Sequence, residues 1–74
     1  MNKIKVILDT QKDVSDFVGL ATTINEPVFL EDGTGFRVNA KSLMGVMYGK
    51  FEFKELWVES ENESIATKFM QFMI

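Results

Sequence analysis

Apolar residues recur at two different spacings along the chain, and the change of spacing separates strands from helices. Between residues 3 and 8, Ile4, Val6 and Leu8 alternate with other side chains, which is the period of a strand with one buried face. After Asp13, apolar side chains recur every three or four residues, which indicates the buried stripe of a helix. The predicted elements are, in chain order, a strand over 3–8, a helix over 14–25, strands over 28–31 and 36–39, a helix over 41–48, a strand over 55–60 and a helix over 63–73.

Short polar residues and glycines predict where these elements begin and end. Asp13 is the expected N-cap of the first helix, and Ser42 is the expected N-cap of the second. Gly49 is expected to stop the second helix. Gly19 lies inside the first helix at a cost in helix propensity, and a close approach to the sheet is the expected reason for it. The two glycines in 32–35 predict a hairpin turn.

The order of these elements is typical of an α+β protein. Strands that follow one another through a hairpin, with helices between the remaining strands, predict helices on one face of an antiparallel sheet. A chain of 74 residues, of which 46% are hydrophobic, can bury one modest core, so a single domain over 1–74 is expected. No apolar run approaches the roughly 20 residues that a membrane-spanning helix needs, so no membrane partner and a cytoplasmic location are expected.

Composition removes several classes of function. The chain has neither cysteine nor histidine, so it lacks thiolate ligands, the commonest metal ligand and the side chain best suited to proton transfer near neutral pH. No metal site or cofactor is therefore expected, and no acid–base pair points to an enzyme. With 8 basic and 11 acidic residues the net charge is −3, which argues against direct binding of nucleic acid.

One segment of the chain, 38–47, carries a family resemblance. It reads Val38-Asn39-Ala40-Lys41-Ser42-Leu43-Met44-Gly45-Val46-Met47. This segment resembles the regulatory-serine motif of HPr, the small phosphocarrier of the bacterial sugar phosphotransferase system. The resemblance implies an HPr-like open-faced sandwich, in which a four-stranded antiparallel sheet of order 1-4-2-3 carries three helices on one face.

The chain departs from that family where the family performs its chemistry. Family carriers accept phosphate on a histidine in the loop after strand one, and this chain has no histidine. The corresponding position falls near Thr10, in a degenerate active-site loop of Thr10, Gln11, Lys12 and Asp13. Asp13 is expected to occupy backbone N–H groups that would otherwise attract phosphate. Histidine phosphotransfer is therefore not expected.

The motif itself offers two compatible roles for Ser42. The first is a helix N-cap, and the second is a kinase target whose phosphate would meet the positive end of a helix beside Lys41. In the family, the neighbouring apolar residues dock partner proteins, which makes Leu43, Met44 and Met47 candidates for docking together with Lys41. Core packing is the alternative for Leu43 and Met47.

A second candidate surface lies on the side of the sheet that faces away from the helices. Period-two alternation predicts that Ile7, Phe29 and Trp57 share this open face. They either form an exposed apolar patch for weak homodimerisation or pack across strands beneath lysine stems such as that of Lys5. The predicted helix over 63–73 is likewise too apolar for one stripe, so its end either folds over the core or docks on another chain.

The leading hypothesis for function is a non-catalytic HPr-like regulatory domain that docks proteins around Ser42, with phosphorylation of that serine as a candidate switch. The resemblance implies two kinds of partner, a serine kinase of the HPr-kinase type and a transcription regulator of carbon catabolite control. The alternative is a structural or interaction module that dimerises through the open sheet face without phosphorylation.

Overall fold

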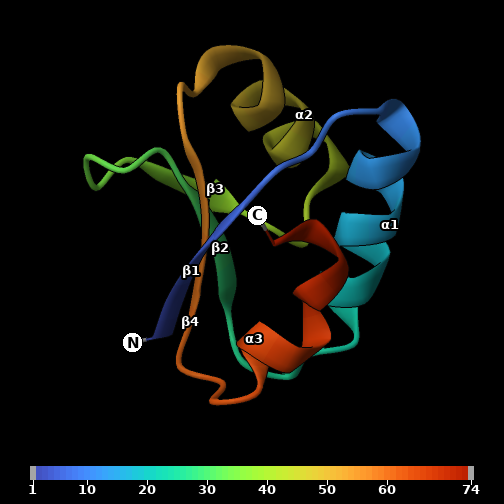
Figure 1. Cartoon of the computed structure of the whole chain (residues 1–74), viewed down its shortest axis with the longest axis vertical. Helices are drawn as coiled ribbons and strands as arrows, with labels where there is room; N and C mark the ends of the chain where they lie inside the picture. The colour runs from blue at the N-terminus through green and yellow to red at the C-terminus, as the bar shows by residue number, and fades with distance from the viewer. Residues whose placement is uncertain (1, 74) are drawn as a thin grey trace.

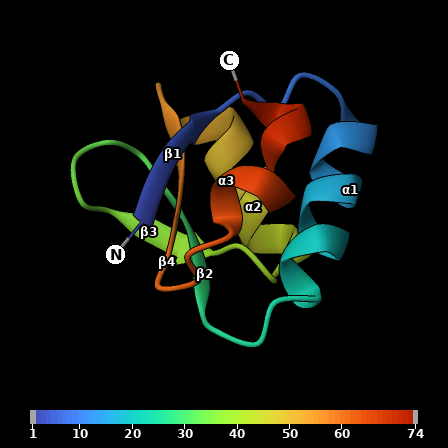
Figure 2. The same ribbon diagram turned by 60° about the horizontal axis from the view of Figure 1, so that its bottom comes forward.

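The structure, a computed structural model, describes residues 2–73. Its strand order is β1-β4-β2-β3, and all three neighbouring pairs are antiparallel. Figures 1 and 2 show the helices on one side of this sheet. The predicted HPr-like α+β fold, with sheet order 1-4-2-3 and three helices on one face, is therefore confirmed. In chain order the elements are β1 (Asn2–Val6), α1 (Gln11–Thr22), β2 (Val28–Glu31), β3 (Arg37–Asn39), α2 (Leu43–Glu52), β4 (Leu56–Ser60), α3 (Ile65–Lys68) and the 3-10 helix η1 (Met70–Phe72).

The hydrophobic core fills the space between the sheet and the helices. Strand alternation supplies one side of it, because inward residues such as Leu30 and Val58 are buried while their strand neighbours face the open side. The helices supply the other side, and the ring of Phe17 on α1 lies 5.0 Å from the ring of Phe69. The buried apolar residues are Val6, Leu8, Val14, Phe17, Ala21, Ile24, Val28, Leu30, Ala40, Val46, Val58, Ile65, Phe69 and Phe72.

The start of α1 differs from the prediction. Its N-cap is Thr10 and not Asp13, and the helix covers Gln11–Thr22 instead of 14–25. The Thr10 hydroxyl oxygen accepts a hydrogen bond from the Asp13 N–H at 3.0 Å, while the Asp13 carboxylate accepts one from the Thr10 N–H at 3.1 Å. This reciprocal capping box satisfies two backbone donors at once, which a cap at Asp13 would not do.

The hairpin turn predicted from the glycines in 32–35 is confirmed, since Gly33 and Gly35 have positive φ between the paired strands β2 and β3. The predictions for the two helix glycines, Gly19 and Gly49, are wrong. Gly19 is exposed, and a Cβ placed there would have nothing within 4 Å, so no close approach to the sheet requires it. Gly49 does not stop α2, which continues to Glu52. It is buried instead, and a Cβ at Gly49 would lie 2.8 Å from Cδ2 of Leu30. The close contact between helix and sheet therefore lies at Gly49.

The C-terminal segment folds over the core, although not as the single helix predicted over 63–73. It forms α3 and then η1, and this break lets Ile65, Phe69 and Phe72 all reach the core. The Phe72 carbonyl accepts a hydrogen bond from the Ile7 N–H at 2.8 Å, which ties the segment to the end of β1. In Figure 1 the red segment accordingly lies beside the exit of β1. Over residues 2–73, no helix has both the length and the apolar character needed to cross a membrane.

Candidate functional site

The segment that leads into α2 is shaped by hydrogen bonds from its own side chains. The Asn39 side-chain oxygen accepts from the Lys41 N–H at 2.9 Å, which turns the chain out of β3. Ser42 then caps the helix, because its hydroxyl oxygen accepts from the Gly45 N–H at 3.1 Å. The predicted cap role of Ser42 is confirmed, and its half-buried side chain lies at the positive end of the α2 dipole.

Lys41 has a structural contact that its position in the motif does not suggest. Its amine donates a hydrogen bond to the Ile24 carbonyl, just beyond the end of α1. A lysine at the end of a helix satisfies a carbonyl that lacks an intrahelical partner. The Lys41 amine therefore ties the start of α2 to the end of α1, and it is engaged away from Ser42.

The side of α2 that faces solvent is apolar. Val46 and Gly49 face the core, whereas the opposite side carries apolar residues at positions i, i+3, i+4 and i+7 of the helix. We call these residues the α2 outer face: Met44, Met47, Tyr48 and Phe51. Met44 is 84% exposed and Phe51 is 72% exposed, whereas Met47 is partly buried against the core. Leu43, 53% exposed, lies at the start of the helix.

Tyr48 and Phe51 belong to this surface and were not among the predicted docking residues. The prediction ended the helix at Gly49, which removed Phe51 from it. A signal was present in the sequence, because a helix over 43–52 has apolar residues on all sides and only Lys50 and Glu52 are charged. A helix that is apolar all round is typical of a buried helix, yet one side of α2 is exposed.

Residues 10–13 lie next to this helix and form a closed hydrogen-bonded turn. The Asp13 carboxylate accepts hydrogen bonds from the N–H groups of Asp9 and Thr10, at 3.0 and 3.1 Å. The Thr10 and Asp9 N–H groups hold the pKa of the Asp13 carboxyl below its ordinary value. As the sequence predicted, Asp13 occupies backbone N–H groups here, although they belong to the turn before the helix. An external anion that bound these two N–H groups would have to displace this carboxylate.

The remaining residues of the degenerate loop take separate roles. The Lys12 amine lies 2.7 Å from the Asp16 carboxylate one turn along α1, and this hydrogen bond raises the pKa of Lys12 above its ordinary value. Lys12 is therefore paired along its own helix. Gln11 begins α1 and lines a cavity between the start of α1 and the side of α2.

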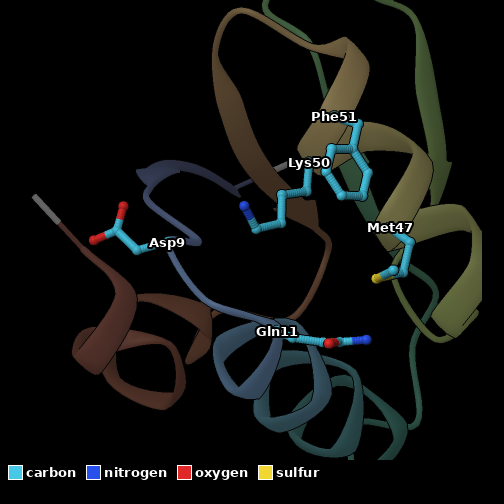
Figure 3. A pocket seen from close by; sticks show the side chains of 5 residues that line it. All are labelled: Asp9, Gln11, Met47, Lys50 and Phe51. Carbon is cyan, nitrogen blue, oxygen red and sulfur yellow. The ribbon is translucent and has the colours of Figure 1, made fainter.

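That cavity joins the degenerate loop to the α2 outer face. Its volume is about 210 Å³, and Figure 3 shows Met47, Lys50 and Phe51 of α2 opposite Asp9 and Gln11. The Lys50 amine lies 5.5 Å from the centre of the Phe51 ring. The cavity thus has an apolar wall from α2 and a polar wall from the β1–α1 connection, and it fits a side chain better than a metal ion. Among residues 2–73, no group of three or more metal-ligating side chains is gathered.

The open sheet face is covered by its own cations and ion pairs. The Lys3 amine lies 5.1 Å from the centre of the Trp57 ring and 2.6 Å from the Glu31 carboxylate, so it joins β1 to β2 above the β4 tryptophan. The Arg37 guanidinium lies 4.0 Å from the centre of the Phe29 ring. It also contacts Glu59 at 3.1 Å, and so joins β3 to β4 above the β2 phenylalanine.

Of the two alternatives for the open face, this geometry matches cross-strand packing beneath basic side chains. Phe29 and Trp57 are half-buried, and Ile7 lies beyond the end of β1 with 44% of its surface exposed. The register places Trp57 opposite Lys5 and Phe29 opposite Glu59, so charged residues separate the apolar ones. The continuous apolar patch expected from Ile7, Phe29 and Trp57 is therefore not formed.

Comparison with solved structures identifies the class of fold. It is an HPr-like open-faced sandwich, similar to the crystal structure of HPr-C-His from Thermoanaerobacter tengcongensis. The two match with a TM-score of 0.68 and 18% sequence identity, over 95% of this chain and 84% of that chain. At this identity the likeness is one of fold alone. No family model matches the sequence, and no curated protein matches it significantly.

Proposed function

We propose that this protein is an HPr-like docking domain that binds a protein partner through the α2 outer face and does not carry phosphate on a histidine. Phosphorylation of Ser42 is the proposed switch. One observation carries the proposal: a helix exposes an apolar face beside a turn in which the Asp13 carboxylate occupies the backbone N–H groups of Asp9 and Thr10.

The loss of carrier chemistry follows from the groups that remain near the start of α1. Thr10 stands near the position of the family's histidine, and its hydroxyl oxygen accepts the Asp13 N–H. A phosphate ester on a hydroxyl does not transfer its phosphoryl group as readily as a phosphorylated imidazole. Asp9 and Asp13 also repel an incoming phosphate, so both the nucleophile and the anion site are missing.

Docking on α2 is supported by the amount of apolar side chain that the helix leaves in water. Met44 and Phe51 point away from a core that is complete without them. Exposed clusters of large apolar residues are uncommon on proteins without partners. Methionine side chains are flexible and suit surfaces that accept another protein.

The switch is supported by the placement of Ser42 at the first turn of the same helix. A phosphate on Ser42 would add negative charge where the α2 dipole is positive, so it can be added without unfolding the helix. It would also change the charge next to Leu43 and Met44, and so alter which partners the outer face accepts.

The direct test uses ATP and a serine kinase of the HPr-kinase type, with intact mass as the measurement. Wild-type protein is expected to gain one phosphoryl group, and Ser42→Ala is expected to gain none. A wild-type protein whose mass does not change contradicts the proposed switch, and phosphorylation of Ser42→Ala contradicts the assigned residue.

A matched pair of variants tests the docking surface in the same reaction. Met44→Lys places a charge on the α2 outer face and is expected to slow phosphorylation of Ser42. Met70→Lys makes the same change at another exposed methionine, 62% exposed in η1, and is expected to leave the rate unchanged. Equal rates for both variants argue against docking through α2. A transcription regulator of the catabolite-control type is the second proposed partner, and the same variants test its binding.

A further inference from the structure

The borders of the α2 outer face differ in chemistry, and this difference describes the partner. On one border the face continues into aromatic residues, because Tyr48 packs edge-on against Phe53 at 6.0 Å and Phe53 against Phe36 at 5.8 Å. Phe36 belongs to the hairpin connection and is 54% exposed. On the other border lie Asp9 and, hydrogen-bonded to its N–H group, the Asp13 carboxylate.

The second border is negatively charged. The Asp9 carboxylate and the Lys50 amine line the cavity at this border, and a second carboxylate, that of Asp13, lies beside them at 3.0 Å from the Asp9 backbone nitrogen. The Lys50 amine lies over the Phe51 ring. Lys12, the next nearest cation in the sequence, is paired with Asp16. An anionic partner would therefore meet net repulsion along this border.

We propose that the partner of this face is a basic amphipathic helix, with its apolar side on α2 and its Lys or Arg residues along the edge that meets Asp9 and Asp13. This inference rests on the proposed function, since it names the chemistry of the partner that docks there. An apolar series at i, i+3, i+4 and i+7 over the ten residues of α2 is the surface that a second helix packs against. Positive charge on that helix complements the acidic border, which raises the association rate and favours basic partners over acidic ones.

A second copy of this chain is a poorer occupant of the same face. When the two α2 helices pack antiparallel, Asp9 and Asp13 of the second copy meet a border that already carries the same two carboxylates. A membrane surface is disfavoured for the same reason, because anionic headgroups would approach an acidic border. A basic partner relieves this repulsion, and an acidic or identical partner increases it.

Three synthetic helical peptides test the proposal. They share one apolar face with the i, i+3, i+4, i+7 pattern and carry Lys, Gln or Glu at their polar positions. Binding to the full chain is measured by fluorescence anisotropy at low and high salt. The Lys peptide is expected to bind at least about tenfold more tightly than the Glu peptide, and this preference is expected to shrink at high salt.

Protein variants then assign the two parts of the surface. Met44→Lys is expected to weaken binding of every peptide, whereas Met70→Lys leaves binding unchanged. Asp9→Asn is expected to reduce the preference for the Lys peptide, and Glu61→Gln, which removes a carboxylate from an exposed position after β4, is the matched control. The two controls, Met70→Lys and Glu61→Gln, show whether a change in the net charge of the protein is enough to alter binding.

The outcomes separate this inference from the proposed function. If all three peptides bind alike and Met44→Lys weakens them, docking on α2 stands and the basic partner is wrong. If none binds, both the docking surface and the basic partner are contradicted. If sedimentation shows a dimer of the free protein that Met44→Lys dissociates, a second copy occupies the face and the inference is overturned.

Discussion

The carboxylate of Asp13 is the hydrogen-bond acceptor at the centre of the turn before α1. It accepts the N–H groups of Asp9 and Thr10, and the pKa of Asp13 is lowered by those two bonds. Backbone N–H groups near the start of a helix are otherwise available to phosphate. In this turn a carboxylate of the protein itself accepts two of them.

The lowered pKa of Asp13 predicts a contribution to stability that depends on pH. The folded state favours the ionised carboxylate, so the contribution is present above the ordinary pKa of 3.8 and is lost as the pH falls through the lowered value. The difference in urea midpoint between wild type and Asp13→Asn is therefore expected at neutral pH and should close below pH 3.8. A difference that stays constant down to strongly acidic pH would show that this charge is not stabilising.

Thr10 supplies the other half of the capping box, so its hydroxyl is expected to stabilise α1. Thr10→Ala should lower the free energy of unfolding by about 1 kcal/mol, as loss of an N-cap does. Ser15→Ala is the control, because it removes an exposed hydroxyl from the middle of the same helix. Equal effects of the two substitutions in denaturant titrations would contradict the assignment of Thr10 as the cap.

Position 42 is expected to accept a negative charge without loss of stability, whereas removal of the Ser42 hydroxyl is expected to destabilise the protein. Ser42→Asp keeps an oxygen that accepts from Gly45 and adds a charge that the helix dipole favours by about 0.3–1 kcal/mol. Ser42→Ala loses the cap at a cost of about 1 kcal/mol. Melting midpoints should rank Ser42→Asp at or above wild type and Ser42→Ala below it. A midpoint for Ser42→Asp several degrees below wild type contradicts this account of the switch.

At the scale of elements, α1 and α2 use their interior glycines for opposite reasons. A Cβ added at Gly19 would point into open space, whereas the missing Cβ at Gly49 lets α2 approach buried Leu30. Gly19→Ala is therefore expected to stabilise the protein by about 1 kcal/mol through helix propensity. Gly49→Ala is expected to destabilise it by about 1–3 kcal/mol through overpacking. Urea titrations of the two variants measure both effects, and a loss of stability in Gly19→Ala would mean that the glycine has a packing role.

The period-two and helical patterns predict elements well when only one face is buried. The alternation of Val6 and Leu8 with Lys5 and Ile7 has one solution, and the structure buries the first two and exposes the others. Element ends were harder to predict, because the segment 10–13 contains two good capping residues. Only the reciprocal bonds of the folded turn distinguish a cap at Thr10 from one at Asp13.

Contacts between distant segments explain what the sequence could not predict. A glycine near a helix end is a usual stop signal, and the contact of Gly49 with Leu30 depends on how α2 lies on the sheet. Ending α2 at Gly49 also hid Phe51 from the candidate site. Trp57 is covered by Lys3, which forms an ion pair with Glu31 across the intervening strand β4. Strand alternation alone does not predict this pair.

At the scale of the whole molecule, the open face links strands that are not neighbours. The Lys3–Glu31 pair joins β1 to β2 over β4, and Glu31 is the one charged side chain that is buried among residues 2–73. Loss of Lys3 would leave that carboxylate buried with the Gly33 N–H as a remaining partner, which is costly for a charge. The open face therefore contributes to stability across the whole sheet.

Two lysine substitutions test this role of the open face. Lys3→Met is expected to unfold at a lower urea concentration than wild type. It is also expected to shift the Trp57 emission maximum to longer wavelength, because the indole ring becomes more exposed to water. Lys5→Met is the control, because the Lys5 amine lies 4.0 Å from a half-exposed Glu55 and its loss should have a smaller effect. If the two variants unfold alike, the Lys3–Glu31 pair does not hold the sheet together.

The central proposal is that this domain with an HPr-like fold does not carry phosphate in the turn after β1. Its most direct test is the intact mass of the protein after incubation with phosphoenolpyruvate and the general phosphotransferase enzyme, with a histidine-containing HPr in the same reaction as the positive control. The account predicts that the control gains an acid-labile phosphoryl group while this protein keeps its unmodified mass. A stoichiometric acid-labile adduct on this protein would contradict the account.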